Sequence, residues 1–165
     1  MSGSLLTGAE RALLLESRRI ILCTIASDGS PRPVPVCFAL VEGGADGGIA
    51  DEAEVRMYSA LDEKPKRVFD PHLLARVRDI EARPVVTLMA DRWDEDWSHL
   101  AWLRLYGTAT LLEPRQGEGS DQGEHVAAVS ALRARYPQYA SQDLAARPII
   151  RVVITRALSW GTLRG

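Results

Sequence analysis

The stretch "ILCTIASDGSPRPVPVCFAL", residues 21–40, decides the fold of this chain. It contains two apolar runs rich in β-branched residues, separated by Asp28-Gly29, and this pattern predicts a β-hairpin. Two strands that meet through so short a turn run antiparallel, because a parallel pair needs a long crossover connection. Pro33 and Pro35 lack the N–H group that donates to a neighbouring strand, so the second strand is expected at a sheet edge or at a bulge.

The rest of the chain adds four strands and three helices by its hydrophobic periodicity. Asp70 and Pro71 suit the start of one helix, and Asp121 and Glu124 have the spacing of a capping box at the start of another. We therefore expect one domain over residues 1–165, mainly β, forming an antiparallel barrel with helices packed outside. The predicted strands are 18–27, 33–41, 55–60, 85–90, 100–112 and 148–160, and the predicted helices are 7–17, 70–84 and 121–136.

Composition narrows the class of protein. The 165 residues are 46% hydrophobic and 25% charged, which is typical of a soluble globular domain. The net charge of −2 gives no overall basic field for nucleic acid, so any anion site must be local. No apolar run is long enough to span a membrane and the N-terminus lacks a basic signal-peptide region, so a cytoplasmic protein is expected. Cys23 and Cys37 lie in apolar runs and are expected to be buried free thiols.

A short basic loop, "LDEKPKR" at residues 61–67, follows the strand that ends with Tyr58 and Ser59. Its three cations are Lys64, Lys66 and Arg67. Charge-assisted donors beside hydroxyl groups suit a phosphate. An ordinary solvated turn is the alternative interpretation.

The second notable segment is "DRWDEDWSHLAW", residues 91–102. Its carboxylates could serve acid–base chemistry or could belong to a solvated loop. Its tryptophans could form a wall for a planar ring, a subunit contact or part of the core. The residues concerned are Asp91, Asp94, Glu95 and Asp96, with Trp93, Trp97 and Trp102.

Motifs for unaided catalysis are missing from the sequence. The three histidines lack metal-ligand spacing, no glycine-rich phosphate motif occurs, and no serine lies in a nucleophile elbow. An enzyme with this sequence would therefore need a cofactor to carry out its reaction.

Three segments together resemble a known family. "ILCTIASDGSPRPVPVCFAL", "RMYSALDEKPKRV" and "RPVVTLMADRWDEDWSHLAWLRLYGTATLLE" are similar to the pyridoxamine 5′-phosphate oxidase-like split β-barrel flavoproteins, over about Arg19 to Trp160. The K-P-K piece and "DWSHLAWLRLYGTA" most resemble the actinobacterial branch that binds the deazaflavin cofactor F420.

The resemblance implies a six-stranded antiparallel split barrel and a homodimer with cofactor sites at the subunit interface. The cations of the basic loop would contact the phosphodiester of F420, or the phosphate of FMN, and Tyr58 and Ser59 would end the strand that leads there. The other implied contacts are Pro35, Val36 and Cys37 against the ring, and Trp97 and Trp102 closing the pocket from the other subunit.

The reaction implied by the resemblance is hydride transfer between reduced F420 and a small organic acceptor. Tyr106 and His99 are the candidates for a proton donor. Two alternatives remain open: an FMN-dependent oxidoreductase on the same barrel, and a non-catalytic protein that carries F420, a flavin or haem. No metal ion is assigned.

Overall fold

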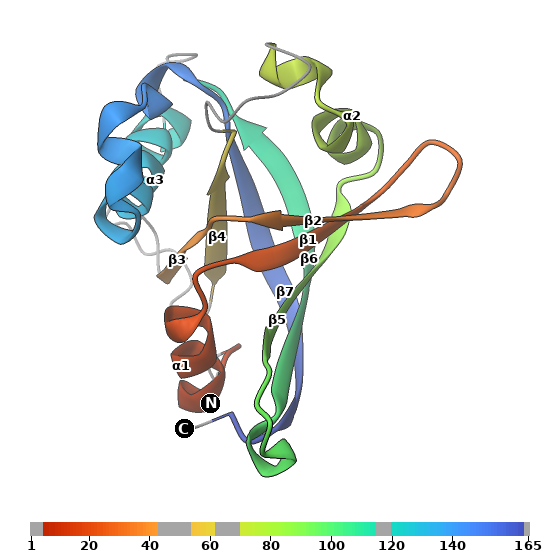
Figure 1. Cartoon of the computed structure of the whole chain (residues 1–165). Helices are drawn as coiled ribbons and strands as arrows, with labels where there is room; N and C mark the ends of the chain where they lie inside the picture. Colours follow the sequence, from red (N-terminus) through yellow and green to blue (C-terminus); the bar gives the residue numbers. More distant parts are fainter. Residues whose placement is uncertain (1–4, 43–53, 62–69, 115–119, 164–165) are drawn as a thin grey trace.

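The computed structural model describes residues 5–42, 54–61, 70–114 and 120–163. Seven strands form one antiparallel sheet in the order β2-β1-β5-β6-β7-β4-β3, with three α-helices around it, which confirms the mainly β antiparallel fold (Figure 1). The strands are β1 (Ile20–Ile25), β2 (Pro31–Val36), β3 (Ala39–Glu42), β4 (Val55–Ala60), β5 (Val85–Arg92), β6 (Ala101–Leu112) and β7 (Ile149–Gly161).

The predicted hairpin is present as β1 and β2. Gly29 has a φ of 85°, which glycine adopts without strain, and its N–H donates to the Ala26 carbonyl at 2.9 Å. Of the two positions expected for the proline-rich strand, a sheet edge or a bulge, the structure has the edge, because β2 ends the strand order. The prolines at 31, 33 and 35 alternate, so their missing N–H groups all face away from β1 and leave that edge poor in donors for another strand.

The predicted strand 33–41 is two strands in the structure, so the sheet has seven strands rather than six. Only Cys37 and Phe38 separate β2 from β3, yet these two strands lie at opposite ends of the strand order. The sheet must therefore curl until its two ends meet, and this gives the barrel its split.

The junction at Phe38 is held by the hydroxyl group of one tyrosine. Phe38 is fully buried, and its backbone N–H donates to the Tyr136 hydroxyl at 3.0 Å. The same hydroxyl lies 3.0 Å from the Phe38 carbonyl and 3.1 Å from the Arg18 carbonyl, either of which can accept its single proton. Tyr136 directly follows α3 (Ser120–Arg135), so this helix is tied to the point where the sheet changes ends.

The other helices differ in how well the sequence predicted them. In α1 (Gly8–Glu16), Thr7 and Glu10 form a capping box, and Ser17 ends the helix as expected. The predicted helix 70–84 is instead a 3₁₀ turn, η1 (Pro71–Leu73), followed by α2 (Ala75–Ala82). Leu74 has an extended ψ of 135°, which interrupts the helix, and Leu73 in the 3₁₀ turn is exposed.

The core has two parts, one on each side of the curled sheet's short strands. The larger part lies inside the barrel and is covered by α1 and α2, while α3 covers the second part over β3 and β4. Within the described residues, no helix combines the length and the apolar character needed to cross a membrane.

We expect Tyr136→Phe to lower the free energy of unfolding by about 1–3 kcal/mol, because the buried backbone groups of Phe38 lose their partner. Urea unfolding followed by far-ultraviolet circular dichroism measures this loss. Ser141→Ala, which removes an exposed hydroxyl, is the control and should change stability by less than about 0.5 kcal/mol. Equal effects of both substitutions would contradict the role given to Tyr136.

Candidate functional site

The central strands bury one face of the sheet and leave the other accessible. Leu22, Leu88, Leu103 and Leu105 point into the barrel and are at most 1% exposed. Their neighbours in sequence point the other way and are half-buried or exposed. We call this second side the open face; it carries Ile21, Cys23, Thr87, Met89, Asp91, Trp102, Arg104, Tyr106, Arg156, Leu158 and Trp160.

Strand register arranges the open face in rows, because residues opposite each other in a sheet share a face. The three rows are Asp91–Trp102–Trp160, then Pro35–Ile21–Met89–Arg104–Leu158, then Pro33–Cys23–Thr87–Tyr106–Arg156. Residues from five strands and from distant parts of the sequence thus form one continuous surface.

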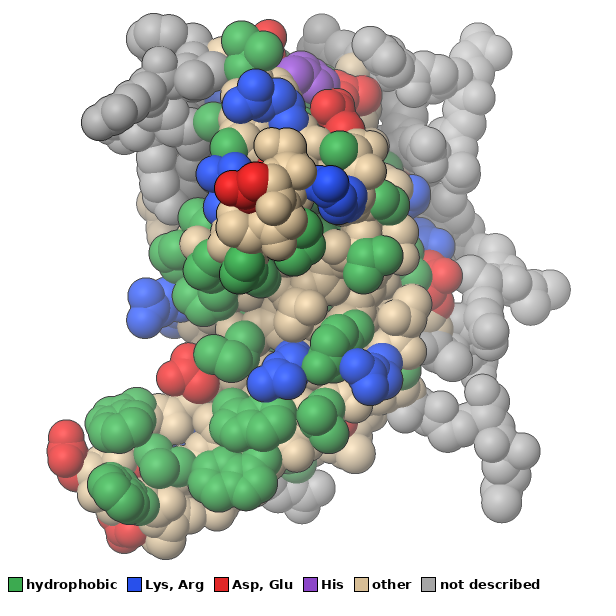
Figure 2. Space-filling view, turned by 90° about the vertical axis from the view of Figure 1, so that its right-hand side faces the viewer, with side chains coloured by type: hydrophobic (Ala, Val, Ile, Leu, Met, Phe, Trp, Pro, Cys, Tyr) green, Lys and Arg blue, Asp and Glu red, His purple; other side chains and the backbone are tan. Residues whose placement is uncertain are grey.

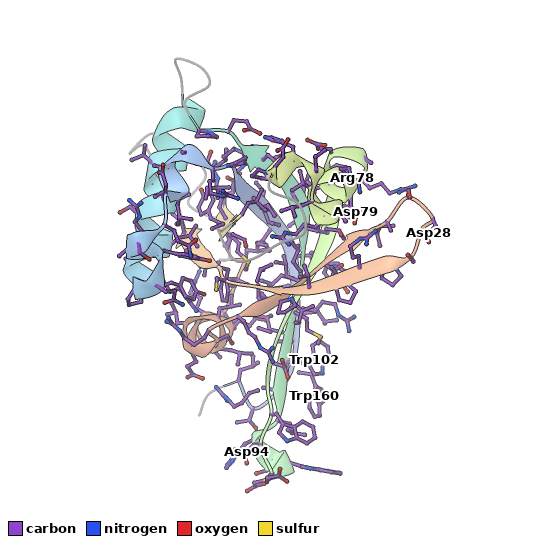
Figure 3. All side chains as sticks on the ribbon, turned by 45° about the horizontal axis from the view of Figure 1, so that its top comes forward. Asp28, Arg78, Asp79, Asp94, Trp102 and Trp160 are labelled. Carbon is purple, nitrogen blue, oxygen red and sulfur yellow. The ribbon has the colours of Figure 1, made fainter. Side chains whose placement is uncertain are left out.

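A hollow of about 290 Å³ lies at the end of this face nearest the β5–β6 connection. We call it the tryptophan hollow, because Trp93, Trp102 and Trp160 line it together with Met89 and Arg104. Figure 3 shows Trp102 and Trp160 next to each other on adjacent strands, as their register requires. Figure 2 shows hydrophobic side chains gathered at this lower end of the molecule, with basic side chains above them.

Two arginines dominate the electrostatics of the open face. The Arg104 guanidinium lies 5.2 Å from the centre of the Trp102 ring, and its Nη1 donates to the Tyr106 hydroxyl at 3.3 Å. The Arg156 guanidinium stacks on the Tyr106 ring, 3.9 Å from its centre. The hydrogen bond from Arg104, and then the positive charges of Arg104 and Arg156, lower the pKa of Tyr106 below its ordinary value.

Of the tryptophans predicted from the sequence, the structure places Trp102 and Trp93 in the hollow. Trp97 lies in a 3₁₀ turn at the tip, η2 (Trp97–His99), and is 72% exposed. Trp160 was not predicted as a site residue, because 58 positions separate it from Trp102 and only the strand register pairs them. The signal in the sequence that could have indicated Trp160 was its position in a strand whose side chains alternate between the two faces.

The predicted ring contacts on the second strand lie in different places. Pro35 is on the open face, in the row of Arg104. Val36 packs in the larger core, and Cys37 packs against the core under α3. Both cysteines are free thiols, as expected, but they are half-buried rather than buried, and Cys23 lies on the open face.

Tyr58 and Ser59 are both buried at the end of β4. The Tyr58 hydroxyl donates to Glu124 at 2.7 Å, and that carboxylate also accepts from Arg151 at 2.8 Å and pairs with Arg56 at 3.2 Å. Burial, followed by the neighbouring carboxylate, raises the pKa of Tyr58. Glu124, expected only as a helix cap, therefore joins α3 to β4 and β7. Lys64, Lys66 and Arg67 lie outside the described residues.

Two acidic side chains of the β5–β6 connection, Asp94 and Asp96, have local structural partners. Asp96 accepts from the Ser98 backbone N–H at 3.0 Å and so caps η2. The Asp94 carboxylate lies 3.4 Å from the ring of His99. His99, one of the two candidate proton donors, is exposed and lies in η2 at the tip of the molecule. Among the described residues, no three His, Cys, Asp or Glu side chains are grouped as metal ligands.

The open face fits a flat, electron-poor ring better than it fits a metal ion. Trp102 and Trp160 offer apolar aromatic surface, and Arg104 offers positive charge at the edge of that surface. The hollow is slightly smaller than most pockets for cofactor-sized molecules and is open on one side.

The sequence profile of the pyridoxamine 5′-phosphate oxidase family matches residues 6–161, and the chain belongs to this family. Family membership agrees with the antiparallel split-barrel fold described above. A search of curated protein sequences gives no match.

Solved structures with the same fold come from proteins of several kinds. A conserved hypothetical protein of Mycobacterium tuberculosis has a TM-score of 0.63 at 17% identity, covering 98% of this chain and 89% of its own. An F420 reductase has a TM-score of 0.56 at 20% identity, covering 96% and 98%. A haem storage protein of Vibrio cholerae has a TM-score of 0.59 at 13% identity, covering 96% and 95%. At these identities the similarity establishes the fold alone.

We expect Tyr106 to ionise before Tyr58 as the pH rises, because Arg104 and Arg156 favour the Tyr106 phenolate whereas burial raises the pKa of Tyr58. Between its folded pKa and the ordinary value of 10.0, the unfolded chain binds more protons, so the free energy of unfolding rises with pH in that window. Ultraviolet titration of tyrosinate measures the order of ionisation.

Two variants control this titration. Tyr106→Phe should remove an ionisation step that lies below the ordinary tyrosine value, and Arg104→Gln should move that step to higher pH. A titration curve unchanged by Tyr106→Phe would contradict the lowered pKa of Tyr106.

Proposed function

We propose that this protein is a homodimeric oxidoreductase that uses the deazaflavin F420 to transfer a hydride between the reduced cofactor and a small organic acceptor. The tryptophan hollow on the open face, with Arg104 at its edge, is the observation that carries this proposal. Membership in the pyridoxamine 5′-phosphate oxidase family and the fold shared with an F420 reductase support it.

Each residue of the open face has a role in this proposal. Trp102 and Trp160 pack against the flat ring and keep water from that side. F420, when bound and reduced, supplies the hydride. Arg104, held between Trp102 and the Tyr106 hydroxyl, provides a fixed positive charge toward the negative charge that develops during transfer.

Tyr106 is the better of the two candidates for a proton donor. Its lowered pKa brings the phenol nearer to working pH, where donors act most efficiently. It also lies on the open face one row away from Met89 and Arg104, whereas His99 is at the exposed tip. Lys64, Lys66 and Arg67 are proposed to hold the phosphodiester of the cofactor.

A second copy of the chain completes the site in this proposal. Met89, Leu158 and Trp160 are exposed on the open face although the core beneath them is already filled. Exposed apolar surface of this kind on a folded domain marks an interaction site. A two-fold pair would cover these residues and add the second wall of the tryptophan hollow.

Titration with F420 and, separately, with FMN tests the cofactor, with quenching of tryptophan fluorescence as the readout. We expect tight F420 binding and weak FMN binding, since the resemblance favours F420. Lys64→Ala combined with Lys66→Ala should weaken F420 binding by about 2–4 kcal/mol, because two charge-assisted contacts are lost. Unchanged affinity in the double variant would remove the basic loop from the site.

The other outcomes separate the alternatives. Preference for FMN would assign an FMN-dependent enzyme on the same fold. Binding of F420, a flavin or haem with no acceptor-dependent change in the cofactor spectrum would assign a carrier protein. Acceptor-dependent oxidation of reduced F420 supports the proposed activity.

We expect a dimeric mass in light scattering at micromolar protein concentration. Met89→Glu combined with Leu158→Glu should convert the dimer to monomer, because charged groups would be buried in the contact. Leu15→Glu is the control: Leu15 is also apolar and is more exposed than Met89 or Leu158, but lies on α1. A dimer that survives the double variant would exclude the open face as the contact.

A further inference from the structure

A second hollow lies on the other side of the β1–β2 hairpin, between its turn and α2. Its volume is about 310 Å³, and we call it the arginine hollow because Arg32, Arg78 and Arg83 line it. Arg32 is opposite Thr24, whose side chain points into the barrel, whereas the adjacent pair Cys23 and Pro33 belongs to the open face. The arginine hollow is therefore separate from the tryptophan hollow.

A buried carboxylate fixes the orientation of Arg32. Asp79 is only 7% exposed, and its Oδ2 accepts from the Thr24 hydroxyl and from the Arg32 Nε, each at 2.8 Å. The cost of burying this charge is offset by these two partners. Only the Nε of Arg32 is used in this way; within the described part of the chain, its two Nη groups donate no hydrogen bond.

The other two arginines differ in how they are held. Arg83 donates from Nη1 to the Ala26 carbonyl at 2.8 Å and from Nη2 to the Ser27 carbonyl at 3.4 Å, which ties the end of α2 to the hairpin turn. Arg78 is exposed and, among the described residues, has no hydrogen bond or ion pair. Figure 3 shows Arg78 and Asp79 on α2, beside the hairpin whose turn carries Asp28.

Small residues make the space between these charges. Ala75 and Ala82 lie on the helix face of Arg78 and Asp79, and their short side chains leave the hollow open. Asp28, the nearest acid of the turn, accepts from the N–H and hydroxyl of Ser30 at 2.9 and 2.6 Å. The lining thus brings three guanidinium groups around one carboxylate, Asp79, that is already hydrogen-bonded.

We propose that the arginine hollow binds the oxyanion group of a small ligand, a phosphate or a carboxylate. Guanidinium groups repel one another when they gather without a counter-charge, and they bind these anions through paired, planar hydrogen bonds. Arg32 and Arg83 are held in place before binding, so little side-chain entropy is lost at those two positions. Arg78 is exposed and provides the third donor for the anion. The site does not depend on the proposed cofactor activity.

The test is a nuclear magnetic resonance titration of the full chain with pyrophosphate and, separately, citrate, at ionic strength held constant with chloride. Saturable shifts of the backbone amides of α2 and of the hairpin turn are expected. Saturation by pyrophosphate alone assigns a phosphate ligand, and saturation by citrate alone assigns a carboxylate. No saturable shift with either anion overturns the proposal.

Matched variants locate the binding. Arg78→Gln should weaken it about tenfold or more, through the loss of one charge-assisted contact. Arg19→Gln removes the same charge from an exposed position at the other end of β1 and should leave affinity within about twofold. Equal losses in both variants would show a general charge effect and overturn the site.

A third variant separates this site from the basic loop. Lys64→Ala combined with Lys66→Ala should leave the titration of the α2 amides unchanged. Loss of those shifts in the lysine variant, with binding retained in Arg78→Gln, would assign the anion to the basic loop and overturn the proposal. If the protein does not bind F420, the outcome of this anion titration is unaffected.

Discussion

The continuity of the chain through Cys37 and Phe38 is the constraint on which the rest of the structure depends. Two strands joined by two residues stand at opposite ends of a seven-stranded order, so the sheet must curve until those ends meet. The hydroxyl of Tyr136 satisfies the buried backbone of Phe38 at this point, and Arg135 stacks on the Phe38 ring, 4.4 Å from its centre. Closure gives the sheet an inside, which becomes the core, and an outside, which carries the open face.

Curvature also explains why the candidate site lies where it does. The long strands β5, β6 and β7 extend beyond the barrel toward the tip, past the end of β4 (Figure 1). Their inner side chains are buried beside α1, where Glu10 accepts from the Ser159 hydroxyl at 2.8 Å. Their outer side chains include Trp102 and Trp160 and have no covering element in the described part of the chain. The core is complete on one side of these strands, so the aromatic side chains on the other side remain accessible to a planar ring or a second subunit.

Local patterns in the sequence predicted the parts of the structure that depend on local rules. The Asp28-Gly29 turn, the edge position of the proline-rich strand and the end of the first helix near Ser17 follow from neighbours in the sequence. The division of residues 33–41 into two strands did not, because the run "VCFALV" is apolar throughout and shows no break. Pairings over long separations were equally hidden: Glu124 with Tyr58, and Asp79 with Arg32, form only once the strands and helices are packed.

The alternation of side chains lets one hairpin serve two separate surfaces. On β1 and β2, Cys23 and Pro33 belong to the open face, while the adjacent pair Thr24 and Arg32 belongs to the arginine hollow. A substitution at one pair therefore leaves the contacts of the other pair in place, although only one residue separates them in the sequence. The same geometry makes the Asp79 carboxylate a link between α2 and the strand that borders the open face. Because both of its hydrogen bonds go to this hairpin, loss of the carboxylate would free Arg32 and weaken the packing of α2 against β1 and β2, while the backbone pairing of the two strands would remain.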